Sequence, residues 1–193
     1  MKIDYNKIMQ QEISSFGEKP KLLLHCCCAP CSSAVIEKIK QFFDITFYFY
    51  NPSIFPQNEY EKRAKEFEKL DVTVIKENYN HNQFLKLVKG KEREKEGRER
   101  CQICIADRLN QTFKYALENN FDVVTTTLSI SPHKDSDFIN IVGEQLAQKY
   151  GIKFLHADFK KQNGYLKSIQ ICKELNIYRQ DYCGCEFSLN IEK

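Results

Sequence analysis

The chain has 193 residues, a formal net charge of +3 and nine cysteines. This length allows an ordinary buried core without disulfide bonds, and no apolar run approaches the roughly 20 residues that cross a bilayer. The weak positive charge permits nucleic-acid binding through a local patch but does not require it.

The N-terminal region, residues 1–19, carries a short amphipathic helix pattern rather than a secretory signal. Residues 1–11 are polar and lack the apolar stretch of a signal peptide. We therefore expect a cytoplasmic protein with no membrane partner. Thiols stay reduced in that compartment, so clustered cysteines are expected to bind metal or to carry out redox chemistry.

Apolar runs of strand length then alternate with helical patterns. Strands are predicted at 21–28, 44–50, 72–75, 123–128 and 153–157, and helices at 33–43, 56–70, 81–88, 104–119, 139–150 and 165–175. This alternation predicts an α/β, Rossmann-like fold, with a mostly parallel sheet of about five strands and helices on both faces. We expect a single domain over residues 1–193, in which 79–100 is the best candidate for an insertion.

Four cysteines lie within six residues at the end of the first predicted strand, where residues 25–32 read HCCCAPCS. Open α/β sheets bind ligands at that end of their strands. Thiolates gathered from several elements can hold an iron–sulfur cluster. Two further pairs follow in the chain: Cys101-x-x-Cys104 and Cys183-Gly184-Cys185. The sequence predicts a metal site built from loop 25–31, the 101–104 motif and the tail 178–188, where Gly184 permits a sharp turn.

The remaining cysteines differ in what they are expected to do. Cys27 and Cys28 would point to opposite faces of a regular strand, so both serve one site only if the strand has already ended. Cys26 is expected to be buried, and Cys172 to be a thiol of the core. Cys31 opens the first helix, and its role stays open between a ligand or redox thiol and a packed cap.

Several other polar residues are candidates for chemistry. His25 is expected to be a packed core histidine, whereas His133 lies in a loop at the functional edge of the sheet. His156 and Asp158 are predicted to share one face of the fifth strand. Asp158 is then either a metal ligand or proton donor, or the cap of the next turn. Asp107, one turn beyond Cys104, either reaches a second metal or is an exposed helix carboxylate paired with Arg108 or with neighbouring bases.

Residues 89–100 read KGKEREKEGRER and are all charge and glycine. Such a segment is typical of a solvated loop. Its position directly before Cys101 also favours a lid or an RNA-contacting segment, and both interpretations stay open.

Nine ordered motifs of the chain closely resemble the QueH family of epoxyqueuosine reductases, from about Leu22 to Ser188. They are His25-x-Cys27-Cys28-Ala29-Pro30-Cys31-Ser32, Tyr50-Asn51-Pro52, Glu59-Tyr60-x-x-Arg63, Gly97-Arg98-Glu99-Arg100-Cys101-x-x-Cys104, Arg108-Leu109, Thr126-Thr127-Leu128-x-x-Ser131-Pro132-x-Lys134, Asp158-Phe159-Lys160-Lys161, Gly164-Tyr165-x-x-Ser168 and Tyr178-Arg179-Gln180-x-Tyr182-Cys183-Gly184-Cys185-x-x-Ser188.

The resemblance implies an oxidoreductase that converts epoxyqueuosine to queuosine in the anticodon loop of tRNA, the last step of queuosine biosynthesis, without cobalamin. It also implies a 4Fe–4S cluster with a second, mononuclear metal ion, expected to be iron, and an external electron donor. The matching positions are Cys27, Cys28, Cys101, Cys104, Cys183 and Cys185, with Cys31 also in the motif.

Within that resemblance we place the cluster on Cys101, Cys104, Cys183 and Cys185 and the second metal on Cys27 and Cys28, and exchange of ligands between the two sets stays open. The second metal would polarise the epoxide oxygen. Candidate catalytic residues are Asp158, His133 and Tyr182, beside Asp107. The tRNA base is expected to stack on an aromatic ring among Tyr50, Phe55, Tyr165 and Tyr182, and its phosphates to meet Lys160, Lys161, Lys167, Arg179 and segment 89–100.

Two other functions, an ATP-pyrophosphatase and a zinc-stabilised RNA-binding module, are the alternatives to this one. A tRNA thiolation-type ATP-pyrophosphatase would carry a glycine-rich phosphate loop after the first strand, where this chain has Cys27-Cys28-Ala29-Pro30-Cys31. A zinc-stabilised RNA-binding module would have closed tetrahedral sites and no redox activity.

Overall fold

The computed structural model describes residues 3–189. Its centre is a sheet of five parallel strands in the order β3-β2-β1-β4-β5. The strands are β1 (Lys21–His25), β2 (Asp44–Phe49), β3 (Thr73–Lys76), β4 (Val123–Thr126) and β5 (Lys153–Phe154). The predicted parallel α/β sheet is confirmed.

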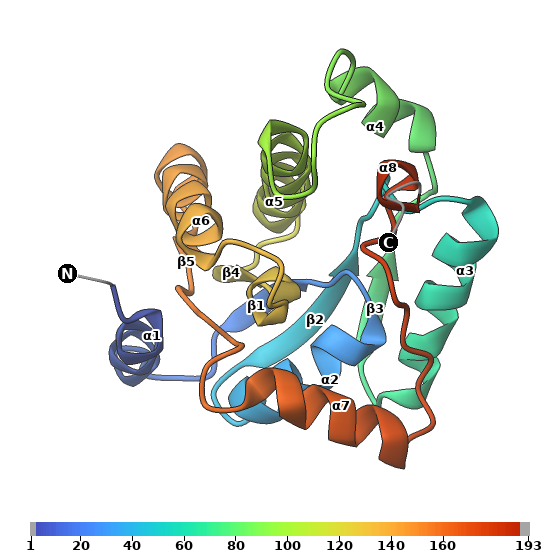
Figure 1. Ribbon diagram of the computed structural model, residues 1–193. Coiled ribbons are helices and arrows are strands. Elements are labelled where there is room, and N and C mark those ends of the chain that lie inside the picture. The colour runs from blue at the N-terminus through green and yellow to red at the C-terminus, as the bar shows by residue number, and fades with distance from the viewer. Residues whose placement is uncertain (1–2, 190–193) are drawn as a thin grey trace.

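Helices cover both faces of this sheet (Figure 1). They are α1 (Tyr5–Ser14), α2 (Ala29–Ile39), α3 (Gln57–Lys65), η1 (Glu66–Lys69), α4 (His81–Leu87), α5 (Glu99–Glu118), η2 (Thr127–Ile130), α6 (Ser136–Tyr150), α7 (Gly164–Glu174) and α8 (Glu186–Leu189). Helices α1, α2, α3 and α7 pack on one face and α5 and α6 on the other. None of these helices, in residues 3–189, has the length and apolar character needed to cross a membrane.

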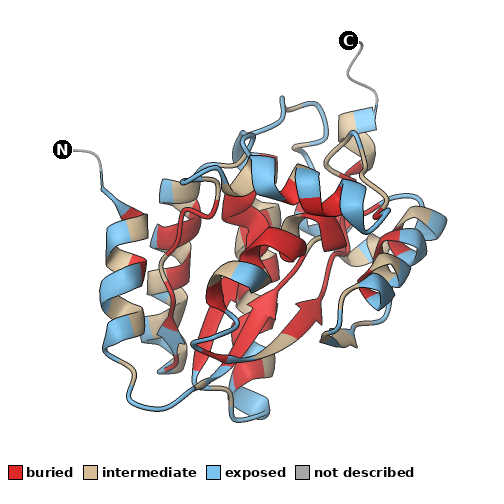
Figure 2. Cartoon of the chain, turned by 90° about the horizontal axis from the view of Figure 1, so that it is seen from below, coloured by how far each residue is buried: buried red, intermediate tan, exposed pale blue. Residues whose placement is uncertain are grey.

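The central strand β1 is buried on both faces, as its unbroken apolar run requires. Leu22 and Leu24 belong to the core under α2 and α7, and Leu23 belongs to the core under α5. Figure 2 shows the buried strands enclosed by helices whose outer surfaces are exposed. This packing fixes the end of β1 rigidly in the middle of the sheet.

The order of the strands places the cysteine-rich turn where the direction of strand addition reverses. The chain runs from β1 outward to β2 and β3 and then returns to add β4 on the other side of β1. Ligands bind at such a reversal point, at the carboxyl ends of the strands. The turn after His25, which pairs with Tyr48 of β2 and Thr126 of β4, lies there.

Strand β1 ends at His25 and not at Cys28 as predicted, and α2 begins at Ala29 and not at Ser33. Cys28 is the extended N-cap residue of α2, and Pro30 lies in its first turn, where the missing N–H costs nothing. The strand has therefore ended before Cys27, which is the condition under which Cys27 and Cys28 can serve one site.

Strand β5 has two residues, whereas the sequence predicted 153–157. After Phe154, the backbone forms hydrogen bonds with side chains of neighbouring helices as well as with strand β4. The Asn140 amide donates to the carbonyl of Ala157 and accepts from its N–H, and the N–H of His156 donates to Glu12. His156 and Asp158 therefore do not share the face of a strand, and that prediction is wrong.

The charged segment 89–100 is organised around Arg100, the side chain of which is buried. Its Nη1 donates to the carbonyl oxygens of Lys91, Glu92 and Glu94, and its backbone N–H donates to the Glu94 carboxylate. The last hydrogen bond satisfies a free N–H in the first turn of α5, which starts at Glu99 rather than at Cys104. Cys101 and Cys104 therefore both lie on this helix.

Candidate metal centre

Three cysteine sulfurs meet in the turn between β1 and α2. The Sγ atoms of Cys27, Cys28 and Cys31 all lie within 4.8 Å of one another. Those of Cys27 and Cys28 are 3.7 Å apart. Cys31 reaches them because α2 starts at Ala29, so that Cys31 lies in its first turn. We call Cys27, Cys28 and Cys31 the turn triad.

The spacing of the turn triad suits one metal ion. Thiolates that bind a tetrahedral ion at about 2.3 Å lie about 3.8 Å from one another. Each cysteine of a 4Fe–4S cluster binds a different iron atom, so the sulfurs of its ligands lie further apart than those around one ion. The turn triad is therefore a cysteine group that could bind a single metal.

A second group of four cysteines lines one cavity of about 120 Å³. Cys101 and Cys104 project from the first turns of α5, and Cys183 and Cys185 come from the C-terminal tail. Four cysteine thiolates are the usual ligands of a 4Fe–4S cluster. The N–H of Gly97 already donates a 3.2 Å hydrogen bond to Sγ of Cys101, which is the kind of contact that tunes such clusters. We call these four residues the α5–tail group.

The tail is held in place by Gly184, as its spacing between two cysteines suggested. Gly184 has a φ of +110°, and a Cβ there would lie 2.8 Å from Nη1 of Arg63. Its carbonyl oxygen accepts a 2.8 Å hydrogen bond from the N–H of Phe55, beside the bridge between Ile54 and Cys185. A side chain at Gly184 would therefore press on Arg63, the Nη1 of which donates a 3.1 Å hydrogen bond to the carbonyl of Cys183.

A larger cavity of about 360 Å³ adjoins the cavity of the α5–tail group. Its wall includes Cys27 and Cys31 of the turn triad and Cys183 of the tail. Five residues line both cavities: Glu96, Arg108, His133, Lys134 and Cys183. The topology thus brings the two cysteine groups to neighbouring sites with a shared wall.

The charges around the thiols favour two thiolates. Hydrogen bonds from Cys28 and Cys31 hold the pKa of Cys27 well below its ordinary value. Burial alone would raise the pKa of Cys183, but the positive charges of Lys134 and Arg108 outweigh burial and lower it. The pKa of Cys28 is raised to about 12, mainly because the Cys28 thiol donates a hydrogen bond to the Cys27 thiolate and so keeps its proton.

Three predicted core residues are confirmed. His25 is fully buried between Oγ1 of Thr126 and the carbonyl of Tyr50, and burial lowers its pKa to about 4. Cys26 is buried, with its Sγ 3.4 Å from the carbonyl of Tyr48. Cys172, on the inner face of α7, is buried.

The predicted catalytic residues do not all meet at the cysteines. His133 is exposed and lines both cavities. Tyr182 lines the larger one and donates its hydroxyl to the carbonyl of Phe55 at 2.9 Å. Asp158 lines a different cavity, which no cysteine lines, and forms a 3.0 Å ion pair with Lys160.

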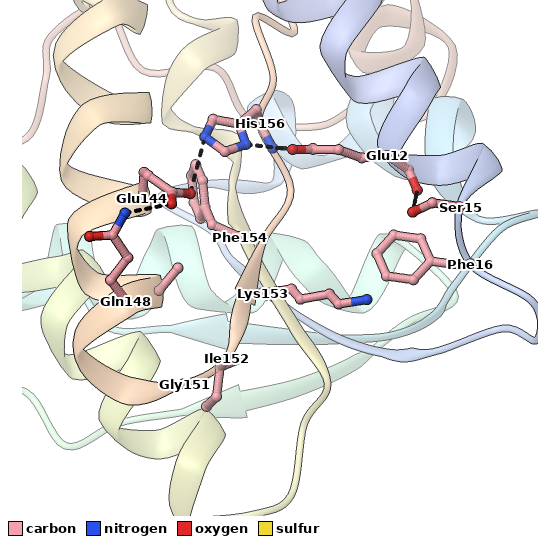
Figure 3. Close-up of a pocket in the computed structure, with 11 residues that line it drawn as sticks. Glu12, Ser15, Phe16, Glu144, Gln148, Gly151, Ile152, Lys153, Phe154 and His156 are labelled. Atoms are coloured by element: carbon pink, nitrogen blue, oxygen red, sulfur yellow. Dashed lines mark hydrogen bonds and ion pairs between the residues drawn. The ribbon is translucent and has the colours of Figure 1, made fainter.

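Two further acidic and basic candidates have structural partners. Asp107 is half-buried and accepts a 3.0 Å hydrogen bond from the Tyr50 hydroxyl, so its predicted place as an exposed partner of Arg108 is wrong. His156 lies in the groove of Figure 3, between Glu12 at 2.7 Å and Glu144 at 3.6 Å. This groove lies between α1, α6 and β5 and contains no cysteine.

Sequence reasoning missed three residues that touch or face the thiols. Gln180 donates to Sγ of Cys28 at 3.1 Å, and Lys134 donates to Sγ of Cys183 at 3.3 Å. Arg108 lies in the wall between the cavities. All three residues belong to the motifs that resemble the QueH family, and this is the feature of the sequence that could have indicated their role.

Comparison with known proteins shows which family the chain resembles. A family model described as epoxyqueuosine reductase QueH matches residues 22–191. A protein named epoxyqueuosine reductase QueH from Streptococcus pyogenes is 42% identical, over 99% of this chain and 80% of the relative. Proteins of the same name from Staphylococcus epidermidis and Thermotoga maritima are 41% and 37% identical, over 97% and 87% of this chain and 85% and 90% of theirs.

Proposed function

Because the chain belongs to the QueH family of epoxyqueuosine reductases, we propose that it reduces its substrate at a metal centre built on the two cysteine groups. The protein is an oxidoreductase of queuosine biosynthesis that converts epoxyqueuosine to queuosine, and its substrate is tRNA that carries epoxyqueuosine. The observation that carries the proposal is the meeting of six cysteines from three segments at two adjoining cavities, with Cys28 beside Cys27 and Cys31.

Our proposal assigns the two cysteine groups to different metals. The α5–tail group, Cys101, Cys104, Cys183 and Cys185, supplies the four thiolates of a 4Fe–4S cluster. The turn triad supplies three closely spaced thiolates for a single metal ion, proposed to be iron. This assignment adds Cys31 to the two residues that the sequence predicted for the second metal.

The chemistry requires two electrons and two protons, since the epoxide oxygen leaves as water and the ring becomes an alkene. A bound cluster supplies electrons one at a time, and an external electron donor must replace them. The residues of the chain then have to hold the substrate and place a proton at the epoxide oxygen. Lys134 and His133 line the cavity beside the turn triad, and Tyr182 lies in the same wall. We propose these as the sources of protons, and Asp158 only if the substrate also reaches its separate cavity.

The larger cavity is the proposed site of the modified base. An enzyme that acts on a base must first take it out of its stack. Tyr165 lines this cavity, and the Arg179 guanidinium lies 5.7 Å from the centre of its ring. An aromatic ring and a guanidinium form a surface on which any base can stack. The nearby lysines Lys160, Lys161 and Lys167 are proposed to meet the phosphates.

The test is an absorbance spectrum of anaerobically purified protein before and after dithionite, followed by turnover of epoxyqueuosine tRNA. We expect a broad visible band that bleaches on reduction, and conversion of epoxyqueuosine to queuosine. A colourless protein that holds stoichiometric zinc after iron–sulfur reconstitution, and does not turn over the tRNA, would refute the proposal. It would favour a zinc-stabilised RNA-binding module instead.

A further inference from the structure

Arg108 is one of the most deeply buried charged groups of the molecule. Its side chain projects from α5 and is 3% exposed. The Nη2 atom donates to Oγ of Ser53, and Nε is buried with no hydrogen-bond partner. A guanidinium keeps its charge at any pH at which proteins fold, so this site holds a permanent positive charge away from water.

Within residues 3–189, no carboxylate forms an ion pair with Arg108. The other deeply buried arginines differ from it: Arg63 forms a 2.7 Å ion pair with Glu59, and Arg100 donates to three backbone carbonyls. The acidic residue next in sequence, Asp107, hydrogen-bonds to Tyr50. Glu96 lines the same cavities but is exposed. A buried charge without a partner is costly, so Arg108 requires a negative group that the carboxylates do not provide.

The groups that can supply this negative charge are the cysteines of both groups, as thiolates bound to metal. Arg108 lines one cavity with Cys104, Cys183 and Cys185 and the other cavity with Cys27. Lys134 faces the same thiols from the loop after η2, with its Nζ 3.3 Å from Sγ of Cys183. Both cations line both cavities. They therefore lie between the two proposed metal positions.

We propose that Arg108 is the counter-ion of the metal centre, and that its charge raises the reduction potential of the cluster. A cluster gains negative charge on reduction, so a fixed positive charge nearby stabilises the reduced form. Reduction by the external donor becomes easier in consequence. This inference rests on the proposed function, since it requires the cysteine groups to hold a redox-active metal.

The first test compares the reduction potential of the cluster in wild type and in variants at position 108. The proteins are reconstituted anaerobically, and the potential is measured by titration monitored through visible absorbance. We expect Arg108→Met to shift the potential to a more negative value, and Arg108→Lys, which keeps a charge, to shift it less. Lys114→Met is the matched control, because it removes one positive charge from the exposed surface of the same helix. It should leave the potential unchanged.

The second test compares thermal unfolding of each variant with and without metal. Replacing a buried, poorly paired charge by an apolar side chain of similar size is often neutral or stabilising. We therefore expect Arg108→Met to destabilise the reconstituted protein more than the metal-free protein. Glu12→Gln should destabilise both forms alike, because it breaks the pair with His156 in a groove that no cysteine lines.

The outcomes separate this inference from the proposed function. A protein that takes up iron and turns over tRNA, but whose potential is the same in wild type, Arg108→Met and Lys114→Met, would overturn the counter-ion role alone. A protein that takes up no iron would overturn both. If Arg108→Met does not fold, Arg108→Gln removes the charge while keeping a donor for Ser53, and the same negative shift is expected.

Discussion

The side-chain amide of Gln180 donates a 3.1 Å hydrogen bond to Sγ of Cys28, which joins the C-terminal tail to the turn after β1. The two residues are 152 positions apart in the sequence. The hydrogen bond supports a residue that we propose as a metal ligand, and such outer contacts orient ligands and tune their affinity.

Replacing Gln180 with Leu should weaken metal binding while keeping the volume of the side chain. The expected loss of affinity for the single iron is about 10–100-fold, which is the usual effect of removing a hydrogen bond to a ligand. It is measured by iron content after dialysis against a chelator. Gln170→Leu is the control, since Gln170 is an exposed residue of α7 bonded to Glu174. Equal iron retention in both variants would argue against this role.

Serine substitutions should separate the two proposed metals. We expect Cys185→Ser to lose the visible band and most of the iron, and Cys27→Ser to keep the band and lose only the single ion. Iron content and absorbance are read on the same samples. Cys172→Ala, on the core-facing side of α7, should behave as wild type. Loss of the whole cluster in Cys27→Ser, with retention in Cys185→Ser, would reverse our assignment.

Gly184→Ala should destabilise the protein by about 1–3 kcal/mol, because a non-glycine residue at positive φ is strained and its Cβ would meet Arg63. The expected fall in Tm is about 2–4 °C for each kcal/mol. Gly90→Ala is the matched control, with a φ of +85° and nothing within 4 Å of its Cβ. The excess loss in Gly184→Ala measures the contact with Arg63. No excess would show that the contact relaxes freely.

The pair of His156 and Glu12 should make stability depend on pH. Burial lowers the pKa of His156, but its hydrogen bond to Glu12 and the charges of Glu12 and Glu144 outweigh burial and raise it. The pair therefore stabilises the fold fully below the unfolded histidine pKa of about 6.5, and this stabilisation is lost as pH rises through the higher folded value.

The stability difference between wild type and Glu12→Gln, measured by urea unfolding, should accordingly be larger at pH 6 than at pH 8.5. Glu118→Gln, at the exposed end of α5, should show no such change with pH. A difference that is constant from pH 6 to pH 8.5 would mean that Glu12 does not raise the pKa of His156.

Tyr165→Ala should weaken binding of the anticodon stem-loop by about 1–3 kcal/mol, the usual value of stacking one base on an aromatic ring. Leu166→Ala is the control, because Leu166 is the exposed neighbour of Tyr165 on α7. Affinity is measured at several salt concentrations. Loss of the phosphate contacts alone would change the salt slope, whereas loss of stacking should lower affinity equally at every salt concentration.

Much of the fold could be predicted because local patterns and packing agree. The run Leu22-Leu23-Leu24 predicts a strand buried on both faces, and the structure buries it so. The cysteines after it could be placed at the functional edge because parallel strands end together there. Gly184 between two cysteines indicated a sharp turn, and its φ is positive.

What could not be predicted depends on contacts between distant residues. Strand β5 ends early because side chains from two helices bind the backbone that follows it. Asn140 of α6 bonds Ala157, and Glu12 of α1 bonds the N–H of His156. Arg108 is a common residue on the surface of a helix, and only the packing of α5 on the sheet buries it. The position of Asp158 in a separate cavity likewise follows from tertiary structure alone.

The contribution of the tail to the α5–tail group has a consequence for the order of events during synthesis. Cys185 follows Cys104 by about 80 residues, so at about 5–20 residues per second a ribosome needs several seconds to bridge the gap. The thiols of α5 spend that interval without their partners, while the turn triad is already complete in sequence. The proposed insertion of metal at the α5–tail group therefore has to follow synthesis of the chain as far as Cys185, and the first six cysteines have to remain free thiols until then.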